Sequence, residues 1–148
     1  MTATAPGQIF FSRTPARAVA VLGSCVAVAL WDPQSGAGGM NHYLLPRWLG
    51  GAETAKYGDV ANLWLLGRFE RAGIPVARLR ARLFGGACVM KPLCDRPNPL
   101  SAQNVAAARE FLAAHAIPID EEHVEGDSGL RVVFDTTDGT ASVRRLRQ

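Results

Sequence analysis

Residues 19–31 form an almost uninterrupted apolar run, which only Gly23-Ser24 breaks, directly before Cys25. The two halves of this region, residues 17–22 and 26–31, have the length of β-strands. Continuous rather than alternating apolarity is typical of strands that are covered on both faces of a sheet. The run therefore predicts two buried strands joined by a short turn that carries a cysteine.

The segment after this run predicts a hairpin. Asp32-Pro33-Gln34-Ser35-Gly36 consists of turn-forming residues, and residues 38–45 are expected to be the returning strand. If Trp31 pairs with Gly36, the register places Cys25 directly opposite His42. Directly paired residues of an antiparallel ladder carry their side chains on the same face, with Cα atoms about 4.5–5.5 Å apart. A thiol and an imidazole are therefore expected to meet on one hairpin.

The order of the remaining helix and strand signals indicates an α+β fold. Helical spacing predicts helices over residues 59–71 and 101–115. Strands gather at both ends of the chain with the helices between them, and no linker divides it, so we expect one domain over residues 1–148. Further strands are expected over residues 8–12, 79–83, 117–124, 130–134 and 141–146, with tight turns at 126–129 and 136–139 and a disordered start over 1–7.

Charge and cysteine content restrict the class of protein. The formal net charge is +3, and no basic stripe is interleaved with aromatic residues, which disfavours nucleic-acid binding. The basic residues at 144–147 are expected to be a solvated tail. The three cysteines are an odd number, so a closed disulfide framework is not expected, and no segment has the pattern of a signal peptide or a membrane span. The sequence therefore predicts a cytoplasmic protein with free thiols and no direct membrane insertion.

The expected pairing of Cys25 with His42 has two interpretations. An imidazole beside a thiol can take its proton, the thiolate can attack a carbonyl carbon, and backbone N–H groups of the Gly23-Ser24-Cys25 turn could stabilise the oxyanion. A cysteine in an apolar strand is, however, more often an inert small hydrophobe, and a lone histidine is more often structural. Spacing alone leaves both interpretations open. Cys88 and Cys94 fit no common closed zinc-site spacing.

Two motifs of the chain closely resemble the chemoreceptor glutamine deamidases, the CheD family. They are Leu22-Gly23-Ser24-Cys25-Val26-Ala27-Val28 and Gly39-Met40-Asn41-His42-Tyr43-Leu44-Leu45-Pro46. The resemblance continues in order along most of the chain, although its later motifs are less specific. These are Tyr57-Gly58-Asp59, Phe84-Gly85-Gly86-Ala87, Leu100-Ser101-Ala102-Gln103-Asn104 and Arg131-Val132-Val133-Phe134.

This resemblance implies a fold, a reaction and partners. The fold would be a two-sheet β-sandwich with helices packed on the outer faces, an arrangement shared with some bacterial toxin deamidases. The reaction would be hydrolysis of specific glutamine side chains on the cytoplasmic helices of chemotaxis receptors, which gives glutamate and ammonia. Cys25 would be the nucleophile and His42 the general base and acid, without metal or cofactor. A CheC-type phosphatase would be a further partner.

Val19 departs from the family pattern. The family carries a threonine at this position as the third catalytic member, whereas valine has no side-chain acceptor. The backbone carbonyl of Val19 could orient His42 instead, since a carbonyl accepts an N–H as a hydroxyl does. Alternatively, the chain is a weakened enzyme kept for binding receptors or a phosphatase. A third hypothesis is a cysteine hydrolase that acts on another amide with the same scaffold.

Overall fold

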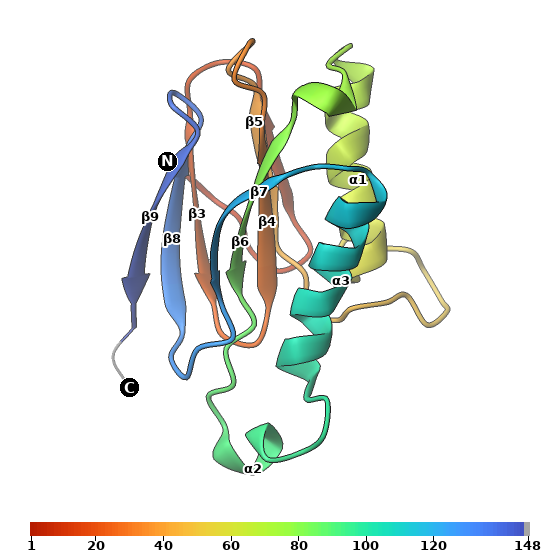
Figure 1. Ribbon diagram of the computed structural model, residues 1–148, viewed down its shortest axis with the longest axis vertical. Coiled ribbons are helices and arrows are strands. Elements are labelled where there is room, and N and C mark those ends of the chain that lie inside the picture. The colour runs from red at the N-terminus through yellow and green to blue at the C-terminus, as the bar shows by residue number, and fades with distance from the viewer. Residues whose placement is uncertain (147–148) are drawn as a thin grey trace.

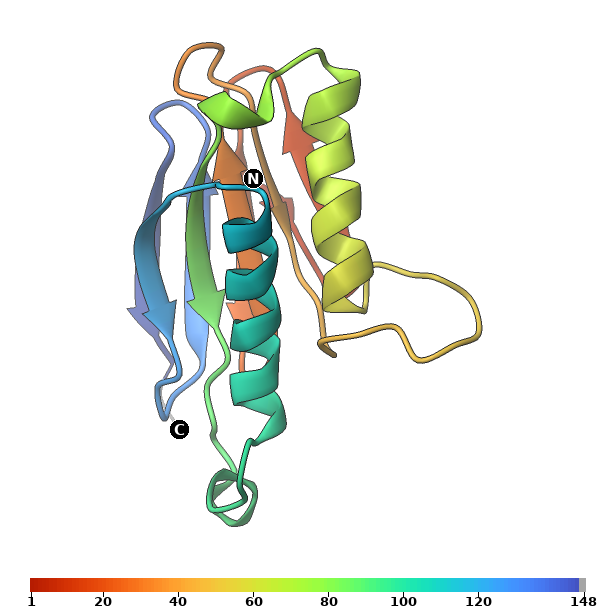
Figure 2. The ribbon, with the colours of Figure 1, turned by 45° about the vertical axis from the view of Figure 1, so that its right-hand side comes forward.

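The computed structural model describes residues 1–146 as two stacked β-sheets with two long helices on one side (Figures 1 and 2). One sheet has four strands in the order β1-β3-β8-β9, and the other has five in the order β2-β5-β4-β6-β7. The predicted α+β class with two sheets is confirmed, and both long helices lie on the same outer face.

Most of the elements lie where the sequence patterns predict them. The strands are β1 (Thr2–Ala3), β2 (Ile9–Ser12), β3 (Arg17–Leu22), β4 (Val26–Trp31), β5 (Gly38–Asn41), β6 (Arg80–Gly85), β7 (Ile119–Val124), β8 (Leu130–Asp135) and β9 (Thr140–Arg145). The helices are α1 (Gly58–Arg71), the short 3-10 helix η1 (Val76–Arg78), α2 (Lys91–Cys94) and α3 (Leu100–Ala114). The exceptions are three short elements. β1, η1 and α2 lie in segments where the sequence predicts neither a helix nor a strand.

The five-stranded sheet is the middle layer of the molecule. Its outer face packs against α1 and α3, and its inner face packs against the four-stranded sheet. β4 is consequently buried on both faces, as its continuous apolar sequence predicts. In β3 alternate residues are buried and Val21 is 58% exposed, because no helix within residues 1–146 covers the outer face of the four-stranded sheet.

The β4–β5 hairpin forms, but the predicted register is wrong by two residues. Trp31 pairs with Gly38 and not with Gly36. The turn is longer than expected because the Asp32 carboxylate accepts hydrogen bonds from two backbone amides inside it, at 3.0 and 3.3 Å. The Asp32 amide in turn donates to the carbonyl of Ala37 at 2.9 Å, which closes the longer loop.

The shift changes the neighbours of Cys25 but not its face. A bridge between Val26 and Tyr43 places His42 across from Ala27 rather than across from Cys25. Side chains alternate along a strand with a period of two, so an even shift keeps Cys25 and His42 on the same face. The two residues are therefore diagonal neighbours, a relation with a typical separation of about 7–8 Å.

Two of the three C-terminal strands form a hairpin, and the third joins the other sheet. β8 and β9 pair around the turn at 136–139, as predicted. β7 pairs in parallel with β6, so residues 126–129 carry the chain between sheets and are not the tight turn of a hairpin. Arg144 and Arg145 of the expected solvated tail belong to β9, whereas Arg147 lies outside the described residues.

The N-terminal residues are part of the fold, which contradicts the prediction of a disordered start. Thr2–Ala3 pairs in parallel with β3, and the Thr4 amide donates to the Val19 carbonyl at 2.8 Å. The Gly7 amide donates to the His42 carbonyl, also at 2.8 Å. Residues 2–7, here called the N-terminal strap, thus cross from the edge of one sheet to the edge of the other.

The expectation of free thiols is wrong for two of the three cysteines. Cys88 and Cys94 form a disulfide that closes the segment around α2, and Cys25 is free. An odd cysteine count excludes complete pairing, but it does not exclude one bond beside a free thiol. Over residues 1–146, no helix has the length and apolar character that crossing a bilayer requires.

Candidate active site

Cys25 lies in the turn where the chain passes from β3 in one sheet to β4 in the other (Figure 1). The end of β6 holds this turn through two backbone hydrogen bonds. Gly86 donates to the Cys25 carbonyl at 2.8 Å, and Ala87 donates to the Gly23 carbonyl at 2.9 Å. A Cβ atom on Gly85 would lie 2.1 Å from the Cys25 carbonyl oxygen, so this close approach requires glycine.

The Cys25 thiol is half-buried, and its surroundings favour the neutral form. Burial raises the pKa of the thiol above its ordinary value, because a thiolate in this position loses solvation. The resting group at neutral pH is therefore the thiol, which needs a base before it can act as a nucleophile.

His42 is buried, and one hydrogen bond determines its protonation pattern. Its Nδ1 atom lies 2.8 Å from the carbonyl oxygen of Thr4. A carbonyl only accepts hydrogen bonds, so Nδ1 carries the proton and Nε2 is left with a lone pair. Nε2 is itself buried and has no hydrogen-bond partner within residues 1–146. This arrangement leaves a free base on an oriented imidazole.

The carbonyl that orients His42 belongs to Thr4, and this corrects the role expected for Val19. The Val19 carbonyl accepts a hydrogen bond from the amide of Thr4. It therefore holds the residue that orients the imidazole and does not contact the imidazole itself. The Val19 side chain lies on the outer face of β3, opposite the buried Ala18 and Ala20. The missing threonine hydroxyl at position 19 therefore leaves His42 with an acceptor, supplied by the backbone of the N-terminal strap.

Cys25 and His42 share the layer between the two sheets but do not form a hydrogen bond. Cys25 packs against the apolar cluster that contains Ala27 and Met40, and His42 follows Met40 on the same face of its strand. Catalytic hydrogen bonds are often long in unliganded enzymes and shorten when substrate binds. The geometry thus supplies a thiol, a correctly protonated imidazole and a shared face.

Backbone donors are available next to the thiol. The amides of Ser24 and Cys25 donate to no backbone carbonyl of the turns and loops within residues 1–146, and the Cys25 amide lies near its own thiol. Free N–H groups beside a nucleophile can stabilise the oxyanion of a tetrahedral intermediate. That the Gly23-Ser24-Cys25 turn binds an oxyanion stays a prediction.

The β4–β5 ladder is open beside His42. The amide of Val28 donates to the side-chain oxygen of Asn41 at 2.9 Å, where a regular ladder would offer a backbone carbonyl. The Asn41 side-chain nitrogen then donates to Asn62 of α1 at 2.8 Å. These buried amides fix the irregular backbone from which the His42 side chain extends.

Sequence patterns indicate no role for two residues of the site, Thr4 and Asn104. Asn104 donates from its side chain to the carbonyls of Ser24 and Leu44. An amide on the buried face of a predicted helix is a signal that could have identified Asn104. Thr4 has no such signal, because its contacts join residues far apart in the chain.

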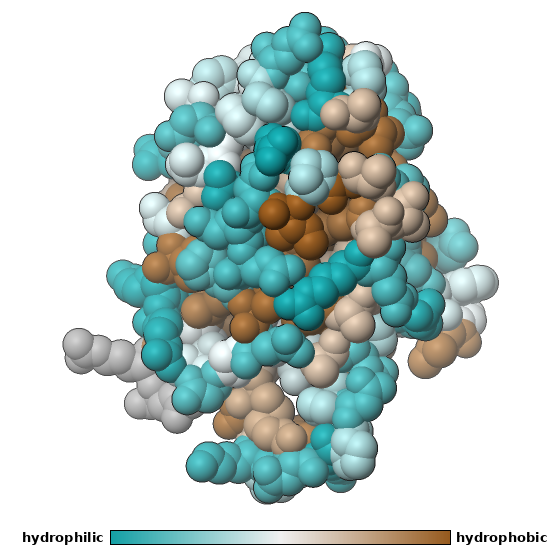
Figure 3. All heavy atoms as spheres, viewed as in Figure 1, coloured by the Kyte–Doolittle hydropathy of each residue, from teal (hydrophilic) through white to brown (hydrophobic). Residues whose placement is uncertain are grey.

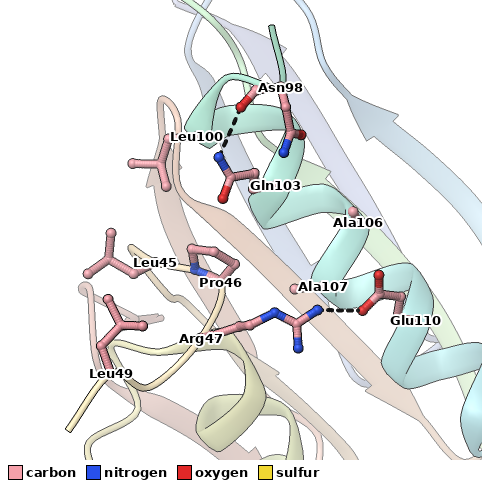
Figure 4. A pocket seen from close by; sticks show the side chains of 10 residues that line it. All are labelled: Leu45, Pro46, Arg47, Leu49, Asn98, Leu100, Gln103, Ala106, Ala107 and Glu110. Atoms are coloured by element: carbon pink, nitrogen blue, oxygen red, sulfur yellow. Dashed lines mark hydrogen bonds and ion pairs between the residues drawn. The ribbon is translucent and has the colours of Figure 1, made fainter.

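A groove of about 490 Å³ lies beside the site, between α3 and the segment that follows His42 (Figure 4). Its walls are mainly apolar, and an ion pair of 3.0 Å between Arg47 and Glu110 crosses one end. Both charged side chains are 64% exposed, so the pair adds little stability. The apolar lining consists of Leu45, Pro46, Leu49, Leu100, Ala106 and Ala107.

A smaller hollow of about 110 Å³ lies on the other side of Leu100 and reaches Ser24, the residue before Cys25. The disulfide-closed segment forms its wall and exposes apolar side chains at the lower end of the molecule (Figure 3). Val89, Met90 and Leu93 are 45%, 62% and 42% exposed. Apolar surface of this kind beside the Cys25 turn is suited to contact with another protein.

The stability of the protein is expected to fall as the pH drops below about 6.5, because burial lowers the pKa of His42 from that ordinary value. Between the lowered and the ordinary pKa, only the unfolded state binds a proton on His42. The free energy of unfolding therefore rises with pH across this window. Urea unfolding of wild type and His42→Gln at several pH values measures the effect. Equal pH slopes for the two proteins would contradict it.

Residues 44–145 match the sequence model of a family described as CheD chemotactic sensory transduction. A "probable chemoreceptor glutamine deamidase CheD 1" from Anaeromyxobacter dehalogenans is 41% identical over 140 residues, which are 95% of this chain and 81% of that protein. A "probable chemoreceptor glutamine deamidase CheD" from Rhodospirillum rubrum is 39% identical over 142 residues, which are 96% of this chain and 80% of that protein.

A solved structure has a similar fold. The crystal structure of the hypothetical protein YfiH from Bacillus licheniformis matches with a TM-score of 0.52 and 16% identity. The match covers 80% of this chain and 51% of that chain. At this identity the likeness concerns the architecture alone.

Proposed function

The chain belongs to the CheD family, and on that premise we propose that it is a protein-glutamine deamidase acting on chemotaxis receptors. It hydrolyses specific glutamine side chains to glutamate and releases ammonia. The observation that carries the proposal is the hydrogen bond from His42 Nδ1 to the Thr4 carbonyl. That bond leaves Nε2 as a base on the sheet face that His42 shares with Cys25.

In the proposed reaction, Nε2 of His42 takes the proton of the Cys25 thiol. The thiolate attacks the side-chain carbonyl carbon of the glutamine, and the N–H groups of Ser24 and Cys25 bind the resulting oxyanion. The imidazolium then protonates the nitrogen, the C–N bond breaks, and ammonia leaves a thioester on Cys25. His42 next takes a proton from water, which attacks the thioester and releases glutamate and the free thiol.

The proposed partners follow from the names of the relatives and from the surface beside the site. Cytoplasmic helices of chemotaxis receptors would lie on the apolar surface that flanks the Cys25 turn, and the location proposed with them is the cytoplasm. A CheC-type phosphatase is proposed as a second partner, as the family resemblance implies. Neither nucleic acid nor direct membrane insertion is part of the proposal.

The proposal is tested by incubating the protein with a cytoplasmic receptor fragment. Mass spectrometry should detect conversion of particular glutamines to glutamate, with one ammonia released per conversion. Protein whose Cys25 has been alkylated beforehand is the matched control and should be inactive. The proposal fails if the fragment stays unmodified while Cys25 reacts normally with iodoacetamide.

The alternative of a weakened enzyme kept for binding makes a different prediction. Such a protein would bind the receptor fragment or the phosphatase normally, and its Cys25 would be unreactive at neutral pH. A hydrolase of another amide would show a reactive Cys25 and turnover of a different substrate. The same incubation, followed by thiol labelling, separates these cases.

A further inference from the structure

Asn104 connects the two segments that carry the proposed nucleophile and base. It lies in the first half of α3 and is completely buried. Its side-chain nitrogen donates to the carbonyl of Ser24 at 3.0 Å and to the carbonyl of Leu44 at 2.9 Å. Ser24 precedes Cys25 directly, and Leu44 follows shortly after His42. One amide group therefore spans both segments.

Chemistry determines the orientation of this side chain. Both neighbouring atoms are carbonyl oxygens, which only accept, so the amide nitrogen must face them. The amide oxygen points elsewhere, is buried and has no partner within residues 1–146. The backbone carbonyl of Asn104 also accepts a hydrogen bond from the hydroxyl of Tyr43, the residue after His42. Asn104 is thus fixed to the His42 segment from both its side chain and its backbone.

The two side-chain hydrogen bonds of Asn104 lie where the β-ladder between the two segments ends. The last backbone pair is Val26 with Tyr43, and beyond it the amide of Leu44 donates to Lys56 rather than back toward Cys25. Two carbonyls that face one another without a donor would repel and lose hydrogen bonds to water. The two N–H groups of Asn104 supply those donors and hold the ends of the ladder together.

We infer that Asn104 is a positioning residue that sets the distance between the Cys25 turn and the His42 segment. The inference rests on the proposed function, since it concerns the geometry of that reaction. Proton transfer requires the thiol and Nε2 to come within hydrogen-bond distance, and the unliganded pair is not yet there. A looser turn would enlarge the range of separations and slow the transfer, without removing any group that touches the substrate.

The test replaces Asn104 by leucine, which has the same branching, is somewhat larger and has no donor. The kcat for deamidation is expected to fall about 10²-fold, the size of effect that a small misplacement of reacting groups produces. The KM for the receptor fragment should change much less. In the free protein the Cys25 thiol meets Nε2 of His42 only transiently, and Asn104→Leu should make these encounters rarer. The pH profile of Cys25 alkylation by iodoacetamide should therefore shift from that of wild type toward that of His42→Gln. The kcat of Asn104→Ser, which keeps a single side-chain donor, should lie between the kcat values of wild type and Asn104→Leu.

The control is Leu112→Ala, which removes a fully buried side chain from the same helix outside the contacts of the site. It should lower the melting temperature while leaving kcat and the alkylation profile unchanged. The inference is overturned if Asn104→Leu, or Asn104→Ser where the leucine variant does not fold, keeps the wild-type alkylation profile. It is also overturned if Leu112→Ala shifts that profile equally. Because alkylation needs no receptor, it tests Asn104 even if deamidation is not found.

Discussion

Replacement of Cys25 by alanine is expected to lower the rate of receptor deamidation by at least about 10⁴-fold, because removing the nucleophile of a serine hydrolase costs on the order of 10⁶-fold. The His42 base and the free N–H groups would remain, but no sulfur would be present to form the thioester. Cys25 is small and only half-buried, so the melting temperature should change little. Ammonia release and mass spectrometry of the receptor fragment measure the rate.

The matched control for Cys25→Ala is the double variant Cys88→Ser with Cys94→Ser. It removes the disulfide and leaves Cys25 as the remaining cysteine. Opening a loop of this length should cost about 2 kcal/mol of stability, because the unfolded chain regains freedom. Most of the activity should remain. A deamidation rate of Cys25→Ala close to that of wild type would show that the cysteine is not the nucleophile.

Local sequence patterns predicted the bounds of β3 and β4, because the cause of these bounds is local, but the expectation that both faces are covered is wrong for β3. The apolar runs of β3 and β4 end at turn residues, and both strands have the predicted bounds. The hairpin register was wrong because the Asp32 carboxylate stabilises a longer turn than composition indicates. The register differs from the predicted one by an even number of residues, so Cys25 and His42 stay on one face of the sheet. The shared face could therefore be predicted, although the direct pairing could not.

The parts that sequence patterns missed depend on contacts between distant residues. The N-terminal strap has small residues and a proline, which by themselves indicate disorder, yet its hydrogen bonds to Val19 and His42 incorporate it into the fold. Cys88 and Cys94 pair because the chain brings them together around α2, which a count cannot reveal. The sequence predicts the carbonyl that orients His42 at Val19, whereas the structure places it at Thr4 in the strap.

Deletion of residues 2–5 from the N-terminal strap is expected to reduce kcat by about 10²- to 10⁴-fold, since an imidazole without its orienting acceptor adopts the wrong tautomer. The deletion removes the Thr4 carbonyl that holds Nδ1 of His42. The strap's strand has two exposed residues, and neither apolar core includes it, so the remainder should still fold. Ammonia release gives kcat, and thermal unfolding reports whether the shortened chain is folded.

Two substitutions separate the backbone carbonyl from the side chains around it. Thr4→Val keeps the carbonyl and removes a buried hydroxyl that has no partner within residues 1–146, so activity should remain near wild type. Val19→Thr should also leave the rate nearly unchanged, because the side chain lies on the outer face of β3. A large gain from Val19→Thr would mean that a hydroxyl at position 19 reaches His42 after all. Full activity in the folded deletion variant would mean that His42 is oriented without Thr4.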